Sequence, residues 1–179
     1  DVKHVDEYRD PRRVAALAQR VLATATRTWT IMEVCGGQTH GILSSGLDAM
    51  IASRVTLLHG PGCPVCVTPI ETLDRASALA SDPNTVLCSF GDMLRVPGSR
   101  GDLLSARARG ADVRIVYAPL DAVRLAERLP ERRVVFLAVG FETTAPAVAI
   151  AARVAREKGL KNFFLLTSHV RVPPALEAI

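Results

Sequence analysis

The chain has 179 residues, of which 49% are hydrophobic and 22% charged, a composition typical of a soluble globular protein. Its net charge is +4, but only 4% of the residues are aromatic and no basic stripe is interleaved with them, which disfavours a nucleic-acid-binding protein. Charges interrupt every apolar run before eighteen residues, and the first residues lack the apolar stretch of a signal peptide, so we expect neither a membrane protein nor an exported one. The four cysteines are then expected to be reduced thiols in the cytoplasm.

Apolar periodicity and turn residues predict an alternation of helices and strands. Helices are predicted over residues 10–26, 39–50, 69–80, 102–109, 120–129 and 145–158, with another that begins at 173. Strands are predicted over residues 28–34, 55–58, 85–90, 113–117, 133–139 and 162–167. This order favours right-handed βαβ units, so the predicted fold class is α/β, a mainly parallel sheet with helices on both faces.

Leu129, Pro130 and the charged residues after them form the best candidate for a domain boundary. Four strand–helix units precede this point and only two follow it. We therefore expect a first α/β domain over residues 1–130, which carries both cysteine loops, and the start of a second α/β domain over residues 131–179. Because a helix has only just begun where the sequence stops, we expect the second domain to be truncated and the chain to be a fragment of a longer protein.

Three of the four cysteines lie in two loops that each follow a predicted strand. Cys35 and His40 belong to Met-Glu-Val-Cys-Gly-Gly-Gln-Thr-His at 32–40, and Cys63 and Cys66 belong to His-Gly-Pro-Gly-Cys-Pro-Val-Cys-Val-Thr-Pro at 59–69. Because ligands bind at the carboxyl ends of parallel strands, we expect the two loops to converge at one edge of a sheet. Thiolate and imidazole ligands suit zinc, iron and copper, and a C-x-x-C pair can also cycle between dithiol and disulfide.

The first loop combines a thiol with residues that admit a ligand. Gly36 and Gly37 permit close approach to the backbone, Thr39 is expected to cap the next helix, and a helix N-terminus favours a thiolate. The alternative is that Cys35 is a small buried apolar residue in a glycine-rich turn. His40 could be a ligand, a proton shuttle or a polar group beside the cap.

Further polar residues follow the later strands. Asp92 could face a ligand or could cap its own loop. Glu142, Thr143 and Thr144 precede a helix with Pro146 in its first turn, where free N–H groups attract anions, although simple capping explains them equally well.

The remaining candidates are single residues. His169 follows the last predicted strand and is a site candidate, whereas His59 is expected to shape its loop rather than bind a ligand. Cys88 lies within an apolar strand and is expected in the core.

At these residues the sequence resembles the HypD family of nickel–iron hydrogenase maturation factors. The resemblance is carried by residues 32–40 and 60–69, by Phe-Gly-Asp-Met-Leu-Arg-Val-Pro-Gly-Ser at 90–99 and by Gly-Phe-Glu-Thr-Thr-Ala-Pro at 140–146. It runs through essentially the whole chain, with the motifs in the family's order. It implies a role in building the iron centre that carries two cyanides and one carbon monoxide, as an assembly scaffold rather than a stand-alone turnover enzyme.

The resemblance also implies residue roles and partners. It makes Cys35 the iron-binding thiolate, with His40 nearby, and Cys63 and Cys66 a redox pair that shuttles electrons or assists ligand transfer. The loop 140–144 matches a motif that lines a cleft between two α/β domains. The implied partners are a small HypC-type chaperone, which shares the iron, and a HypE-type protein, which delivers cyanide.

Two departures from the family pattern are visible. Gln38 stands where many members have His, so an imidazole role at that position is unsupported. Family members also carry a C-terminal four-iron, four-sulfur cluster whose cysteine ligands this chain does not contain, so we expect it to lack the cluster. Two other functions stay open at this point, a thiol–disulfide oxidoreductase that uses Cys63 and Cys66 alone, and a binding module stabilised by structural zinc.

Overall fold

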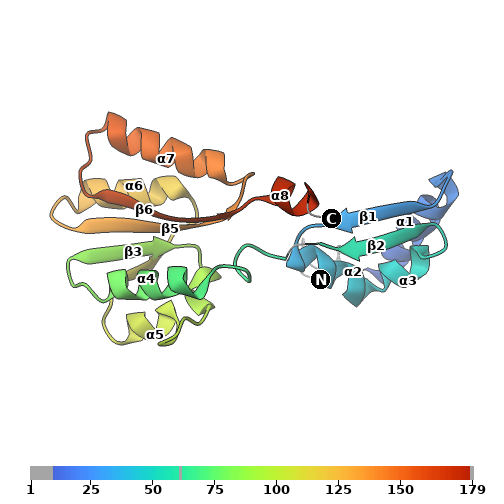
Figure 1. Ribbon diagram of the computed structural model, residues 1–179, viewed down its shortest axis with the longest axis horizontal. Helices are drawn as coiled ribbons and strands as arrows, with labels where there is room; N and C mark the ends of the chain where they lie inside the picture. Colours follow the sequence, from blue (N-terminus) through green and yellow to red (C-terminus); the bar gives the residue numbers. More distant parts are fainter. Residues whose placement is uncertain (1–9, 61, 178–179) are drawn as a thin grey trace. The chain divides into compact units, whose positions relative to one another are not determined.

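The computed structural model describes residues 10–60 and 62–177. Its strands form two parallel sheets, one of two strands (β1-β2) and one of four (β4-β3-β5-β6), with helices between the strands (Figure 1). The predicted α/β class is therefore confirmed. The chain divides into two compact units, which we call unit 1 (residues 1–63) and unit 2 (residues 64–179). Pro61 of the second cysteine loop lies outside the described residues.

Unit 1 is a small α/β unit built on one pair of strands. It contains α1 (Pro11–Thr24), β1 (Trp29–Glu33), α2 (Gly36–Ser45), α3 (Leu47–Ile51) and β2 (Val55–His59). Helix α1 begins where predicted, because Pro11 takes the first helical position and the Asp10 carboxylate accepts a hydrogen bond from the Arg12 N–H. Strands β1 and β2 pair in parallel, with Glu33 opposite His59 as the last pair.

The single helix predicted over residues 39–50 is two helices. Gly46 has a φ of 65°, which ends α2 in the left-handed region and lets α3 start in a new direction. Helix α2 also begins three residues earlier than predicted, with Cys35 as its N-cap residue. The expectation that Thr39 caps this helix is therefore wrong, since Thr39 lies inside its first turns.

The core of unit 1 is small. Ala18, Ile51 and Val55 are buried, and Leu22, Leu47 and Leu57 pack against them. Three large apolar side chains of the two strands stay exposed, Trp29 at 40%, Ile31 at 47% and Leu58 at 42%. The two-stranded sheet thus keeps part of its apolar surface uncovered in the described chain.

Unit 2 is a larger α/β unit with a four-stranded sheet. It contains α4 (Ile70–Ala80), β3 (Thr85–Ser89), the 3₁₀ turn η2 (Met93–Arg95), α5 (Leu103–Ala108), β4 (Val113–Ile115), α6 (Pro119–Arg128), β5 (Arg133–Phe141), α7 (Ala145–Glu157), β6 (Phe163–Val170) and α8 (Val172–Glu177). Strand β5 lies between β3 and β6, and residues 134–140 of it are buried. The predicted burial of this β-branched strand on both faces is confirmed.

Alternate residues of the central strands face opposite layers of helices. Leu87 and Val135 belong to a cluster with residues of α4 and α5, whereas Val86 and Phe136 belong to a cluster with residues of α6 and α7. Figure 1 shows α4 and α5 on one side of this sheet and α6 and α7 on the other. Helices on both faces, as predicted, position the carboxyl ends of four parallel strands at one edge of unit 2.

The division of the chain differs from the expected boundary near Pro130, which falls inside unit 2. Strand β5, directly after this point, pairs with β3 in the same sheet. The Asn162 side-chain amide donates hydrogen bonds to the carbonyl oxygens of Ala126, Leu129 and Arg132, at 2.9, 2.9 and 3.0 Å. The segment around Pro130 is therefore a tightly bonded turn between α6 and β5 and not a linker.

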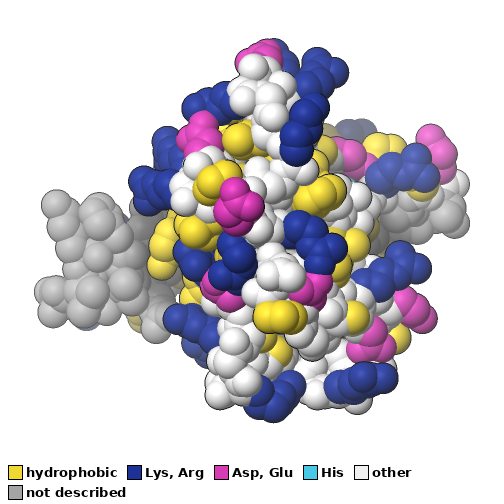
Figure 2. Space-filling model, turned by 90° about the vertical axis from the view of Figure 1, so that its left-hand side faces the viewer, with side chains coloured by type: hydrophobic (Ala, Val, Ile, Leu, Met, Phe, Trp, Pro, Cys, Tyr) yellow, Lys and Arg dark blue, Asp and Glu magenta, His cyan; other side chains and the backbone are white. Residues whose placement is uncertain are grey.

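The surface carries mixed charge. On the face of the molecule in Figure 2, Lys and Arg side chains are scattered among Asp and Glu side chains rather than gathered in one stripe. No helix among the described residues is both long and apolar enough to cross a membrane.

Replacing Asn162 by Ala should destabilise unit 2, because three carbonyl groups lose a shared donor. We expect the free energy of unfolding to fall by about 1–3 kcal/mol, measured by urea denaturation followed by circular dichroism. Asn84→Ala is the matched control, since the Asn84 side chain makes no hydrogen bond within the described chain and its loss should cost less than about 0.5 kcal/mol. Equal effects of the two substitutions would contradict this account of the turn.

Candidate functional site

The carboxyl end of β1 carries a buried carboxylate, Glu33, whose side chain is 5% exposed. Its Oε1 accepts hydrogen bonds from the Thr39 hydroxyl and from His59 Nδ1, the latter at 2.8 Å. Its Oε2 accepts a hydrogen bond from the Cys35 N–H at 3.2 Å. Hydrogen bonds from Thr39, from His59 and from the Cys35 N–H hold the pKa of Glu33 below its ordinary value, although burial opposes this.

Cys35 lies at the N-terminus of α2, where the network around Glu33 fixes its backbone. Its extended conformation (φ −178°, ψ 123°) is that of an N-cap residue, and its carbonyl oxygen accepts the hydrogen bond from the Thr39 N–H at 2.9 Å. The thiol is partly exposed. A Cβ atom built on Gly37 would lie 3.8 Å from Cys35 Sγ, so the backbone passes close to the sulfur.

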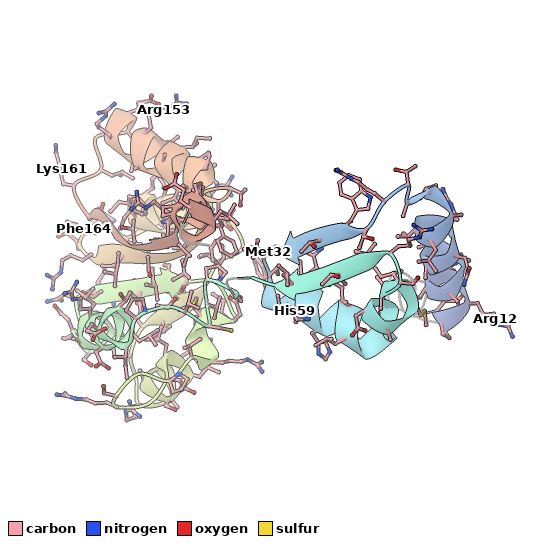
Figure 3. The ribbon with its side chains drawn as sticks, turned by 45° about the vertical axis from the view of Figure 1, so that its right-hand side comes forward. Arg12, Met32, His59, Arg153, Lys161 and Phe164 are labelled. Atoms are coloured by element: carbon pink, nitrogen blue, oxygen red, sulfur yellow. The ribbon has the colours of Figure 1, made fainter. Side chains whose placement is uncertain are left out.

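The loop after β2 lies directly against the loop after β1. The Gly60 N–H donates to the Glu33 carbonyl oxygen at 2.9 Å, which extends the pairing of the two strands by one step. Glycine is required at position 60, because a Cβ atom there would lie 2.8 Å from the Glu33 carbonyl oxygen, a backbone atom that cannot move aside. A Cβ atom on Gly36 would lie 3.7 Å from Cys63 Cβ. The predicted convergence of the loops is confirmed for Cys35 and Cys63, and Figure 3 shows Met32 and His59 at this end of the two strands.

His40 lies further along α2 and is exposed. It lines a cavity of about 640 Å³ together with Gly37, Ser44 and, from α1, Pro11 and Val14. Gly37 borders both this cavity and the Cys35 sulfur. His40 thus lies on the α1 side of the Cys35 loop, apart from the hydrogen bonds that Glu33 makes.

Cys66 belongs to unit 2, in the turn that precedes α4. The Thr68 hydroxyl donates to the Pro64 carbonyl oxygen at 2.7 Å and fixes this turn, in which Cys66 is exposed. The division between the two units falls between Cys63 and Pro64. The two cysteines of the C-x-x-C motif therefore belong to different units.

The other predicted site residues follow strands of unit 2. Asp92 is exposed and its carboxylate accepts a hydrogen bond from the Met93 N–H at 2.9 Å, so the structure gives it the capping role. Thr143 and Thr144 are exposed. The N–H groups of Thr144 and Ala145 already donate to the Phe141 and Glu142 carbonyl oxygens, which satisfies these donors at the start of α7.

Glu142 and His169 lie at the same edge of the sheet. Glu142 Oε1 accepts a hydrogen bond from the Val172 N–H at 2.7 Å and joins the β5–α7 turn to the start of α8. His169 lies within β6, opposite Gly140 of β5, and not after the strand as predicted. Its Nε2 is buried without a hydrogen-bond partner among the described residues. A Cβ atom on Gly140, opposite His169, would lie 1.9 Å from Thr144 Oγ1 and 3.0 Å from Thr144 Cβ, so a larger residue would displace the Thr144 side chain.

Cys88 is fully buried in β3, which confirms its predicted place in the core. Burial raises the pKa of its thiol to about 12, so this sulfur stays protonated at neutral pH. It takes no part in the site.

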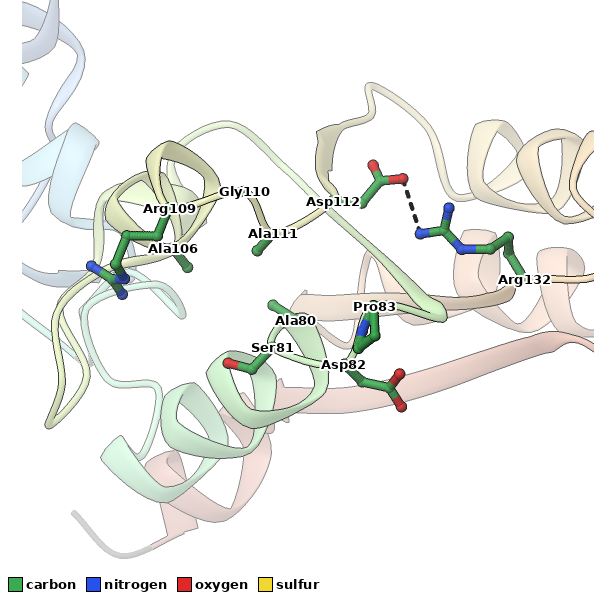
Figure 4. Close-up of a pocket in the computed structure, with 10 residues that line it drawn as sticks. All are labelled: Ala80, Ser81, Asp82, Pro83, Ala106, Arg109, Gly110, Ala111, Asp112 and Arg132. Atoms are coloured by element: carbon green, nitrogen blue, oxygen red, sulfur yellow. Dashed lines mark hydrogen bonds and ion pairs between the residues drawn. The ribbon is translucent and has the colours of Figure 1, made fainter.

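A cavity of about 650 Å³ lies elsewhere in unit 2, beside the C-terminal ends of α4 and α5 (Figure 4). Two of its charged residues, Asp112 and Arg132, bond to one another at 3.3 Å, and Asp112 also pairs with Arg114 at 2.7 Å. None of the predicted site residues lines this cavity.

Comparison with known proteins identifies the family of the chain. The chain matches the family described as HypD, "Hydrogenase formation hypA family", over residues 12–179. The chain belongs to the HypD family. It is 46% identical to the hydrogenase maturation factor HypD of Escherichia coli K12, 50% identical to that of Azotobacter vinelandii and 48% identical to that of Rhizobium leguminosarum bv. viciae, each over 99% of this chain. These alignments cover 50%, 48% and 47% of the relatives, so the chain spans about half the length of the HypD proteins that it matches.

The sequence did not single out Glu33, the residue whose hydrogen bonds join the two cysteine loops of this HypD-family chain. An acidic residue at the end of an apolar strand is unremarkable in itself. The feature that could have identified Glu33 was the register of the two strands, because Glu33 lies opposite His59 and two residues before Cys35. A carboxylate paired with imidazole at the carboxyl end of two parallel strands would have marked the site.

Glu33→Gln should lower the stability of unit 1 at neutral pH, because an amide offers one acceptor oxygen where three donors converge. The Glu33 pKa is lowered in the folded state, so this stabilisation is present above the ordinary value of 4.5 and is lost as the pH falls through the lowered folded pKa. The difference in unfolding free energy between wild type and Glu33→Gln should therefore shrink below pH 4.5. Urea denaturation followed by Trp29 fluorescence measures it, because Trp29 is the only tryptophan and lies in unit 1.

Glu131→Gln provides the same chemical change at an exposed carboxylate that accepts no hydrogen bond in the described residues, and it should leave stability nearly unchanged at every pH. A constant difference between wild type and Glu33→Gln from neutral to acidic pH would contradict the assigned role of the carboxylate.

Proposed function

We propose that the protein is a scaffold that assembles and transfers the iron centre of nickel–iron hydrogenase, an iron ion with two cyanide ligands and one carbon monoxide ligand, and that the Cys35 thiolate binds this iron as cargo. The observation that carries the proposal is the Cys35 loop in a member of the HypD family. Its backbone is fixed by Glu33, its sulfur is partly exposed, and the two glycines that follow it, Gly36 and Gly37, add no side chain beside the sulfur. Thiolates are soft ligands and suit low-spin iron with diatomic ligands.

The small number of protein donors supports an iron that is shared. The described residues contain no group of three or more His, Cys, Asp or Glu side chains arranged to hold a metal ion. An iron ion that already carries three diatomic ligands needs few donors from this chain. The HypC-type chaperone expected from the family resemblance would supply the rest, and a HypE-type protein would deliver cyanide.

Cys63 and Cys66 are proposed as the redox pair. Two thiols that form a disulfide release two electrons and two protons, and the reverse reaction takes them up. Cys63 lies against Gly36 at the start of α2, beside the proposed iron ligand. The pair is thus assigned to electron supply or ligand transfer at the Cys35 site.

Four residues of unit 2 are proposed as further functional residues. Glu142, Thr143, Thr144 and His169 occupy the carboxyl edge of its sheet, where α/β proteins bind their ligands. The buried Nε2 of His169 has no partner in the described residues, which supports a role for this imidazole.

A four-iron, four-sulfur cluster does not fit the cysteines of this chain. Such a cluster takes four cysteine thiolates, and the chain has four cysteines in all. Cys88 is enclosed in the core with a pKa of about 12. The cluster stays an expectation for the longer members of the family.

A thiol–disulfide oxidoreductase is the second candidate, because Cys66 is exposed and so accessible to another protein's disulfide. Reduction of insulin by the protein would favour it, provided that this activity survives Cys35→Ala.

Cys35→Ala should remove the iron centre, since the substitution deletes the proposed ligand. In the complex with the HypC-type chaperone, we expect the infrared bands of iron-bound cyanide and carbon monoxide to weaken by about ten-fold or more. Cys88→Ala also removes one thiol, but from the core, and should keep the bands. Undiminished bands in Cys35→Ala would refute the assignment.

A further inference from the structure

We propose that His59 is a second iron donor beside Cys35, and that Glu33 is the positioning residue that presents its Nε2 to the metal. This inference rests on the proposed function. It changes the role of His59 from shaping its loop to binding the cargo.

The hydrogen bond to Glu33 fixes the imidazole. Nδ1 of His59 lies 2.8 Å from Glu33 Oε1, and because a carboxylate accepts, the proton lies on Nδ1. Nε2 then carries the lone pair. Histidine ligands of metals nearly always donate their other ring N–H to a carboxylate, a carbonyl or water, which orients the ring and raises its basicity.

The Glu33 and His59 side chains differ in burial. The Glu33 side chain is 5% exposed and the His59 side chain 41% exposed, so the carboxylate lies beneath and the ring reaches the surface. Nε2 has no hydrogen-bond partner in the part of the chain that the structure describes. A partly exposed histidine whose Nδ1 is held by a buried carboxylate, and whose Nε2 has no partner in the described residues, is arranged to bind a ligand.

The same carboxylate places His59 beside Cys35. Oε1 bonds the imidazole of His59 and Oε2 bonds the backbone N–H of Cys35, so one carboxylate holds the two residues that carry the proposed donors. Glu33 and His59 are also the last pair in register of the two strands. An iron ion with three diatomic ligands, one thiolate and one imidazole has five ligands. A sixth position of an octahedral ion is then left for a donor from a partner protein.

His40 differs from His59 in each of these respects. It lies on α2 beside the cavity shared with α1, and no carboxylate of the described residues bonds its ring. The position of His59, and not sequence proximity to Cys35, makes it the better donor.

The test uses Co²⁺ as the probe, bound anaerobically to the purified protein. A sulfur-to-cobalt absorption band reports the Cys35 thiolate. A paramagnetically shifted proton signal, seen in H₂O and absent in D₂O, reports a coordinated imidazole that still carries its Nδ1 proton. We expect wild type to show both.

His59→Ala should keep the absorption band, lose the shifted signal and weaken Co²⁺ binding by about ten-fold or more. Because this variant could disturb the loop, His59→Gln serves as a second variant, since its amide can still donate to Glu33 but supplies no imidazole. Glu33→Gln should also weaken binding by about ten-fold and speed exchange of the shifted proton with solvent. The matched control is Asp74→Asn, which removes another carboxylate that holds a loop, through Ser99, but in unit 2, and it should change neither readout.

The outcomes separate this inference from the proposed function. A shifted signal that persists in His59→Ala and His59→Gln, or is absent from wild type while the absorption band is present, overturns the role of His59 alone. An absorption band that is missing from wild type, or that survives Cys35→Ala, contradicts the proposed function and with it the inference.

Discussion

The organisation of unit 1 depends on one buried carboxylate. An ionised Glu33 removed from water needs hydrogen bonds to both oxygens, and it receives them from three residues in two separate segments, the start of α2 and the end of β2. The N–H of Cys35 fixes the residue that starts α2, the hydroxyl of Thr39 fixes the first turns of that helix, and His59 fixes the end of β2. The hydrogen bonds that stabilise the buried charge of Glu33 are therefore the same ones that fix the candidate site.

The two units illustrate two ways to position residues at strand ends. In unit 2, a sheet covered by helices on both faces gives a rigid edge, and the central strands β3 and β5 each contribute residues to the core clusters on both faces. Unit 1 has only a small core, with three buried apolar residues. Its precision comes instead from polar bonds between loops and from a glycine at position 60 that admits the neighbouring strand.

The sequence was sufficient for the alternation of strands and helices and for the loops that follow the strands, although it missed the local break at Gly46. Alternating strands and helices predicted the α/β class, and the position of Cys35 and Cys63 after successive strands predicted that their loops meet. The sequence was insufficient where a contact depends on how two strands pair. The contact between Glu33 and His59 requires the register of two strands 26 residues apart, which no local pattern contains.

Strand length explains the misplaced histidine. The strands predicted over 133–139 and 162–167 extend to Phe141 and Val170, because they pair with each other over eight residues, and His169 thus lies within the sheet. The boundary expected at Pro130 had a similar origin. Proline beside charged residues is common in linkers, and only the distant Asn162 shows that this segment is fixed.

The turn around Pro130 has a consequence for how this protein can vary. Surface turns with proline and charged residues are usually the places where chains accept insertions or new termini. Here the side-chain amide of Asn162 bonds three carbonyl oxygens, at residues 126, 129 and 132. An extra residue inserted between these positions would move at least one carbonyl oxygen beyond hydrogen-bond distance of the amide. A segment that resembles the most permissive part of the chain is thus among the least tolerant of a change in length.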